Sequence, residues 1–357
     1  EKMYEMLLCE DVDLDRKTEI VAGYLQSLLS DRHDTGRGDY LFSVLRDQYP
    51  HEPKVLDLAA RYSAAKQEFA EAEEQILYAL DMEPGNRTYW GQLITYQLAA
   101  DSTDKALATY DEAMRHVEPD NDLRHLRASV AMQAERYDLA IATYRTMAAE
   151  VDSTLRTDTL VTLSDVRPDI SLGELDRLSQ LFTAMGDTWH LAEQRDSAYM
   201  AYENAIAFDD SNILAKNNYA YFLSIDGGDL VKARELSAQT ITGENADNAT
   251  NLDTYAWILH LSGENQEAER YQKMAVEAME KQGYESPELF DHYGDILMKL
   301  GNAREALANW RKARELDPEI RDIDKKISEA EKILKERSGE NAAPGDSGES
   351  DLESDEK

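Results

Sequence analysis

Cysteine, positive charge and long apolar runs are all scarce in this chain of 357 residues, and each shortage excludes something. Cys9 is the single cysteine, so the chain cannot form an internal disulfide or a site of several thiolates, which leaves its redox compartment open. No stretch approaches the ~18 consecutive apolar residues of a membrane-spanning helix, although 42% of the residues are hydrophobic. We therefore expect a packed core and no direct membrane insertion.

The shortage of positive charge limits the classes of molecule that the chain can bind. The chain has 38 Lys and Arg against 72 Asp and Glu, for a formal net charge of −34. A surface this negative repels phosphate backbones and anionic lipid headgroups. Nucleic acid and membrane surfaces are therefore excluded as partners, and proteins remain.

Clustered donors for catalysis or metal binding are also absent. The seven histidines are scattered, at positions 33, 51, 116, 125, 190, 260 and 292, and none belongs to an HExxH or HxH motif. The chain has no phosphate-binding loop and no GxGxxG motif. We predict no catalytic residue, no metal and no cofactor.

The two ends of the chain suggest a segment of a longer protein. The sequence begins with Glu1 rather than Met and shows no signal peptide, so we expect an N-terminally trimmed chain. Residues 338–357 contain seven acidic residues and one Lys among Gly, Ser and Pro. Such a composition cannot offset the entropy of ordering, so this acidic tail is predicted to be disordered.

A small-residue pattern recurs along most of the chain, at a period near 34 residues. At one place of the period the residue is always alanine: Ala72, Ala106, Ala140, Ala198, Ala233, Ala268 and Ala306. Twelve residues earlier, or thirteen for Ala220, a small residue is usual: Ala60, Ile94, Ala128, Gly186, Ala220, Ala256 and Gly294. Two amphipathic helices joined by a tight turn explain these spacings, because small residues stand where helix axes approach closely. We expect Ala306 between two helices and Ala303 in the exposed turn.

A large aromatic residue follows the invariant alanine in four of the periods, as Tyr110, Tyr144, Tyr202 and Trp310. Ile76, Ser237 and Gln272 stand there instead in the other three. The fifth and sixth periods, which contain Ser237 and Gln272, are therefore predicted to pack more loosely.

The spacing of the periods divides the chain. They begin near Pro53, Arg87, Asn121, Ser179, Ile213, Ala249 and Pro287, so the intervals are 34, 34, 58, 34, 36 and 38 residues. We predict N-terminal helices without the full signature over residues 1–52 and three repeats over 53–154. The chain is then predicted to continue with an irregular insert or extra helix over 155–178, four repeats over 179–320, a capping helix over 321–337 and the tail over 338–357.

These spacings resemble the tetratricopeptide repeat over about two thirds of the chain. Motifs such as residues 217–223 and 252–259 are similar to those of large tetratricopeptide-repeat proteins of Bacteroidales-type bacteria. The resemblance implies an all-α, right-handed α-solenoid, a superhelix of about seven helix-turn-helix repeats. It favours the bacterial cell envelope or periplasm slightly, with the cytoplasm as the alternative.

The resemblance also implies a concave groove lined by the first helix of every repeat. Carried onto this chain, the groove-lining places are held by Asn217, Tyr221, Asp253, Trp257, His260, Asp291 and Asp295. The basic clamp with which some members hold a terminal carboxylate is missing here. An acidic, aromatic groove favours a basic or amphipathic peptide or helix of a protein partner. Packing roles for Tyr221 and Trp257 are the alternative.

Two classes of function agree with these observations. The first is a non-catalytic scaffold that binds a peptide or helix of a partner protein in the groove. The second is a regulatory or substrate-recruiting arm of an enzyme whose catalytic domain lies upstream of residue 1. The sequence does not identify the partner.

Overall fold

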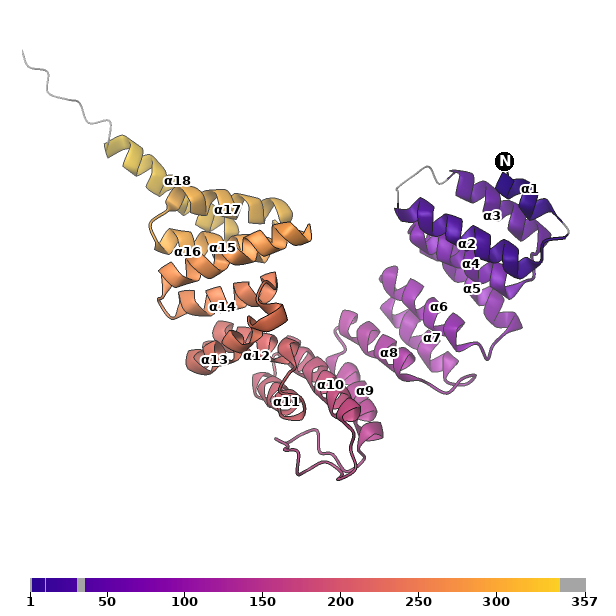
Figure 1. Ribbon diagram of the computed structural model, residues 1–357, viewed down its shortest axis with the longest axis horizontal. Helices are drawn as coiled ribbons and strands as arrows, with labels where there is room; N and C mark the ends of the chain where they lie inside the picture. The colour runs from indigo at the N-terminus through magenta and orange to yellow at the C-terminus, as the bar shows by residue number, and fades with distance from the viewer. Residues whose placement is uncertain (1, 10, 31–35, 341–357) are drawn as a thin grey trace, which may run out of the picture. The chain divides into compact units, whose positions relative to one another are not determined.

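The computed structural model describes residues 2–9, 11–30 and 36–340, and over these residues it is helical without any strand. The chain divides into two compact units, Glu1–Phe208 and Asp209–Lys357, which are described separately (Figure 1). This division falls inside the block of four repeats predicted over 179–320. Residues 341–357, most of the tail predicted to be disordered, lie outside the described residues.

The N-terminal unit is a succession of helices paired as antiparallel hairpins (Figure 1). Its helices are α1 (Lys2–Leu8), α2 (Leu14–Ser30), α3 (Gly36–Gln48), α4 (Pro53–Ala65), α5 (Phe69–Met82), α6 (Arg87–Ala99), α7 (Thr103–Ala113), α8 (Asn121–Gln133), α9 (Tyr137–Val151), α10 (Leu172–Leu191) and α11 (Arg195–Phe208). Helices α1–α3 do not repeat the pattern, but they bury Leu7, Val21 and Leu45 against Val55 and Leu58 of α4.

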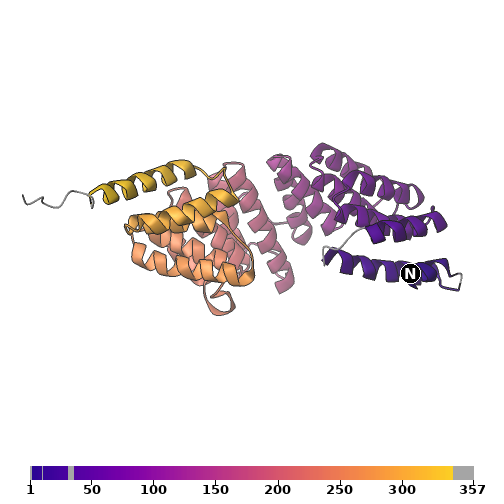
Figure 2. The same cartoon turned by 90° about the horizontal axis from the view of Figure 1, so that it is seen from above.

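The C-terminal unit contains three further hairpins and a terminal helix. Its elements are α12 (Ile213–Ile225), α13 (Leu230–Thr240), the 3₁₀-helix η1 (Gly243–Asn245), α14 (Ala249–Leu261), α15 (Asn265–Gln282), α16 (Pro287–Lys299), α17 (Ala303–Leu316) and α18 (Ile323–Glu340). Helix α18 packs on α17 (Figure 2) and buries Ile323, Ile327 and Ala330, the narrow apolar stripe expected of a cap. It continues three residues past the predicted end at 337.

Every hairpin turn contains one residue in the left-handed backbone region. These residues are Gln67, Asp101, Glu135, Glu193, Gly227, Gly263 and Gly301, which recur at the intervals predicted for the repeats. In the C-terminal unit these residues are glycines, whereas in the N-terminal unit they have a Cβ. A left-handed conformation destabilises a residue with a Cβ by roughly 1–2 kcal/mol, and glycine avoids this cost.

The alanine pattern marks the helix contacts. All seven invariant alanines are 0% exposed, as is Ile94, the one large residue among the small places twelve or thirteen residues earlier. Two of those small places are glycines for a steric reason. A Cβ at Gly186 would lie 2.6 Å from the ring of Tyr202, and one at Gly294 would overlap the indole of Trp310. Ala303, which was expected in an exposed turn, is instead 1% exposed at the start of α17, so that expectation is wrong.

The three hairpins without the aromatic residue bury its replacements completely. Ile76, Ser237 and Gln272 are each 0% exposed. Gln272 is long enough to cross from α15 to polar groups on α14 and α16, with consequences for the site described below.

The residues between the third and fourth hairpins form an ordered loop, 152–171, followed by the 20-residue helix α10. The buried Asn204 of α11 holds the loop, since its Oδ1 accepts from the backbone N of Val161 and its Nδ2 donates to the carbonyl of Thr159, both at 2.9 Å. Ser171 and Glu174 form a capping box that starts α10. The last seven residues of the predicted insert therefore belong to this helix.

Candidate functional site

The seven candidate residues lie on the first helices of the three hairpins of the C-terminal unit. Asn217 and Tyr221 are on α12, Asp253, Trp257 and His260 are on α14, and Asp291 and Asp295 are on α16. Helix α14 contacts both α12 and α16. We call the surface formed by these three helices the first-helix face.

Asp253 is at the centre of this face and is buried, with 4% of its surface exposed. Its Oδ2 lies 3.0 Å from Nδ1 of His292 on α16, and its Oδ1 accepts from Nε2 of Gln272 at 2.5 Å. The same Nε2 group also donates to the carbonyl of Leu289 at 3.0 Å. Gln272, which replaces an aromatic residue, thus connects α14, α15 and α16 through one carboxylate.

His292 faces Asp253 from a buried position, with 6% of its surface exposed. Burial alone would lower the pKa of His292, but the carboxylate of Asp253, aided by Glu288 and Asp291, raises it above its ordinary value. The ring also stacks on Trp257, with 4.1 Å between ring centroids and 15° between planes. The charged imidazolium is therefore favoured in this small buried network.

An aromatic group extends from His292 toward the surface. Trp257 also stacks on His260, at 5.0 Å and 25°, and Nδ1 of His260 lies 2.7 Å from Oδ1 of Asn265. Burial lowers the pKa of His260, opposite to His292. The pKa values of the two histidines beside Trp257 are therefore shifted in opposite directions.

Tyr221 connects the outer helices of the face. Its hydroxyl donates to Oε1 of Glu288, so α12 reaches α16 across α14, and its ring lies 6.5 Å from that of His292. Burial and the neighbouring carboxylates raise the pKa of Tyr221, which keeps its hydroxyl protonated as a donor. Tyr221, Trp257 and His260 are all half-buried.

Asp291 and Asp295 share a lysine of the terminal helix. Nζ of Lys326 on α18 lies 2.7 and 2.8 Å from the two carboxylate oxygens of Asp291, and 2.8 Å from Oδ2 of Asp295. Burial raises the pKa of Asp291 in spite of this ammonium group. Burial opposes the charge on Lys326, but the two carboxylates outweigh it and raise the pKa of Lys326. The three short contacts indicate an ionised cluster.

Two buried polar atoms of the face have no hydrogen-bond partner among the described residues. They are Oδ1 of Asn217, an acceptor, and Nε1 of Trp257, a donor. Leaving such an atom unsatisfied costs about 1–3 kcal/mol. The face therefore keeps hydrogen-bonding capacity that the fold itself does not use.

The structure thus brings six of the seven candidate residues into two connected clusters: Tyr221, Asp253, Trp257 and His260 in one, and Asp291 and Asp295 in the other. Asn217 makes no hydrogen bond to any of them. Sequence reasoning missed Gln272, Glu288, His292 and Lys326, which supply the partners. The signal in the sequence is the replacement of the aromatic residue by Gln272, from which the pattern alone predicts looser packing.

The described residues contain no group of three or more His, Cys, Asp or Glu side chains placed to hold a metal ion. None of the helices in residues 2–9, 11–30 and 36–340 combines the length and the apolar character needed to cross a bilayer.

Comparison with known proteins identifies the fold. No protein-family model and no curated protein sequence matches the chain. A solved tetratricopeptide repeat protein from Parabacteroides merdae is similar over 78% of this chain and 98% of its own, with a TM-score of 0.55 at 15% identity. Cut9–Hcn1, an APC/C hetero-tetramer, contains a chain similar over 94% of this one but only 56% of its own, with a TM-score of 0.51 at 11% identity. The predicted all-helical tetratricopeptide-repeat fold and the structural likeness to a Bacteroidales protein are confirmed.

Proposed function

We propose that this chain, an all-helical protein with the tetratricopeptide-repeat fold, is a non-catalytic scaffold that binds a helix or peptide of a partner protein. We place the binding site on the first-helix face of the C-terminal unit. Repeat solenoids use such faces for extended ligands, because each repeat adds one more helix to a continuous surface. The ligand we propose is a basic amphipathic helix.

The observation that carries this proposal is the position of Lys326. Helix α18 is itself amphipathic, and it packs its apolar stripe on the last hairpin while its lysine reaches the carboxylates of Asp291 and Asp295. The chain therefore already contains one example of a lysine-bearing helix on carboxylates of α16. A partner helix would use the same chemistry on the neighbouring part of the face, near Tyr221 and Trp257.

The half-buried aromatic side chains fit this ligand. Lysine and arginine stems pack on aromatic rings while their charged groups meet carboxylates. The buried, unsatisfied acceptor of Asn217 and donor of Trp257 are chemically suited to polar groups of an incoming segment. Because the charges near the surface are screened over a Debye length of ~8 Å at physiological ionic strength, binding should weaken as salt rises.

Fluorescence anisotropy with a labelled Leu/Lys amphipathic peptide and its Leu/Glu counterpart tests the proposal on the full chain. The basic peptide should bind and the acidic one should not. Asp295→Asn should weaken binding several-fold, since it removes the charge of a half-buried carboxylate of the face, whose side chain is 21% exposed beside Lys326. Glu280→Gln, which removes the same charge from an exposed position on α15, is the matched control.

Circular dichroism must first show that both variants retain the wild-type helical signal and thermal midpoint. Equal weakening by Asp295→Asn and Glu280→Gln would mean that only the overall negative field attracts the peptide. Equal binding of the acidic peptide would exclude a carboxylate-lined site altogether.

A further inference from the structure

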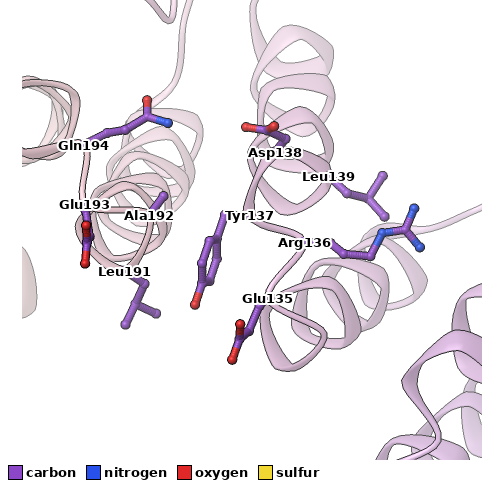
Figure 3. A pocket seen from close by; sticks show the side chains of 9 residues that line it. All are labelled: Glu135, Arg136, Tyr137, Asp138, Leu139, Leu191, Ala192, Glu193 and Gln194. Atoms are coloured by element: carbon purple, nitrogen blue, oxygen red, sulfur yellow. The ribbon is translucent and has the colours of Figure 1, made fainter.

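The N-terminal unit contains an open cleft between two neighbouring hairpin turns, far along the chain from the first-helix face. It has a volume of about 730 Å³ and lies between the α8–α9 turn and the α10–α11 turn (Figure 3). The first turn contributes residues 135–139 to its lining, and the second contributes residues 191–194. This volume exceeds that of any single side chain, so the cleft can admit part of another molecule.

The cleft exists because nothing fills the gap between these turns. At the preceding pair of turns, Gln133 reaches across and donates to Oδ1 of Asp101 at 2.8 Å and to the carbonyl of Leu98 at 3.3 Å. Gln133 stands two residues before Glu135, the left-handed residue of its turn. At the next turn Leu191 stands two residues before Glu193, and its apolar side chain cannot form such hydrogen bonds. It stays 54% exposed instead.

The side chains around the cleft combine an aromatic ring, apolar groups and carboxylates. Figure 3 shows the ring of Tyr137 between the two turns, with Glu135 beside it and Glu193 and Leu191 on the opposite turn. Neither Glu135 nor Glu193 forms an ion pair with any residue that the structure describes. Arg136 is the one basic lining residue, and its side chain points away from Tyr137.

This combination fits a guanidinium group. Arginine stacks on aromatic faces and can donate hydrogen bonds to more than one carboxylate, because its planar group has five N–H donors. Its aliphatic stem needs apolar surface, which the exposed Leu191 offers at the rim. With three acidic lining residues against one basic one, the cleft attracts a cation and repels an acidic segment.

We propose that this cleft is a second docking site, which takes an arginine side chain from an apolar-flanked segment of a partner protein. The guanidinium group lies against Tyr137 between the carboxylates of Glu135 and Glu193. The site is independent of the first-helix face, because it uses other residues in the other unit. A scaffold with two separate basic-segment sites can hold two partners, or two parts of one partner.

Nuclear magnetic resonance titration of the isotope-labelled full chain tests this proposal. The probe is acetyl-Leu-Arg-Leu-amide, and its control is the citrulline peptide, which has nearly the same shape without the charge. We expect the arginine peptide to shift the amide resonances of residues 135–139 and 191–194 to saturation. The citrulline peptide should bind at least about fivefold more weakly.

Two double variants test whether the carboxylates of this cleft attract the arginine peptide. Glu135→Gln with Glu193→Gln should weaken arginine binding about fivefold, whereas Glu74→Gln with Asp81→Asn, on exposed positions of α5, should leave it unchanged. Equal binding of the citrulline peptide would overturn the proposal, and so would equal weakening by both double variants. The citrulline comparison uses the wild-type chain, so the test does not depend on the folding of any variant. None of the four substitutions alters a residue of the first-helix face, and any binding of the peptide there would appear separately, as shifts of α12, α14 and α16 resonances.

Discussion

Replacing Gly294 by alanine should destabilise the C-terminal unit, although the same change usually stabilises a helix. A helix interior gains about 1 kcal/mol when alanine replaces glycine, because glycine loses more backbone entropy on folding. At Gly294, however, a Cβ would lie less than 3 Å from three atoms of the Trp310 indole. These two effects on the free energy of unfolding oppose each other, and the net result depends on whether the indole can move away from the added Cβ.

The indole cannot move aside easily. Trp310 is 3% exposed, its Nε1 donates to the carbonyl of Asp291 at 3.2 Å, and it packs in the core that also seats α18. Overpacking of this kind costs ~1–3 kcal/mol. After subtraction of the helix gain of about 1 kcal/mol, we expect a net loss of up to about 2 kcal/mol, with a midpoint lower by roughly 2–4 °C per kcal/mol.

Thermal and urea unfolding followed by circular dichroism, with hydrogen exchange to localise the effect to α16–α18, would measure this loss. Gly91→Ala in α6 is the matched control, since a Cβ there meets its nearest atoms only at 3.7 Å. Gly91→Ala should therefore stabilise the N-terminal unit. Adding Trp310→Tyr to Gly294→Ala should restore part of the loss, because Ala128 and Tyr144 already coexist in the third hairpin. A Gly294→Ala chain as stable as the wild type would refute the steric reasoning.

Three further predictions follow from the turns and from the first-helix face. Gln67→Gly should raise the free energy of unfolding by about 0.5–1 kcal/mol in urea titration, because Gln67 has φ 64° and the relief of strain exceeds the added chain entropy; no gain would show that this turn carries no strain. The folded pKa of His292 lies above its ordinary value of 6.5, so its pairing with a carboxylate stabilises the C-terminal unit fully below about pH 6.5 and is lost as pH rises through the folded pKa. The urea midpoint should therefore fall over that range in the wild type and stay flatter in His292→Gln, and parallel pH profiles would contradict the assignment. Lys326→Met should cost ~1–3 kcal/mol and increase hydrogen exchange in α18, because it leaves the carboxylates of Asp291 and Asp295 without their ammonium partner; unchanged exchange would mean that the apolar stripe alone holds the helix.

The repeat architecture could be predicted from the sequence because its causes are local and periodic. Close helix crossings admit only small side chains, so alanine had to recur at the same place in every hairpin, and all seven such alanines are fully buried. The left-handed turn residues follow the same intervals. An apolar stripe on an otherwise charged helix likewise predicted the cap α18, since a terminal repeat must seal one side and face water on the other.

The chemistry of the candidate site could be predicted only in part. The pattern placed Asp253, Asp291 and Asp295 on first helices, but it could not show that each already has an internal partner. Those partners come from 39 residues away for Asp253 and His292, and 35 for Asp291 and Lys326, so no local pattern connects them. Their pairing depends on how α14, α16 and α18 stack.

The cleft between the turns is a purely tertiary feature for the same reason. Glu135 and Glu193 are ordinary exposed acids in the sequence, 58 positions apart, and an irregular loop and an unusually long helix separate them. Only the packing of α10 on α9 brings their turns together, and only the substitution of leucine for a bridging glutamine leaves the space open. Sequence periodicity therefore determined which residues form helices and which of their faces are buried. The stacking of hairpins decided which charges meet, because those contacts join residues of different hairpins.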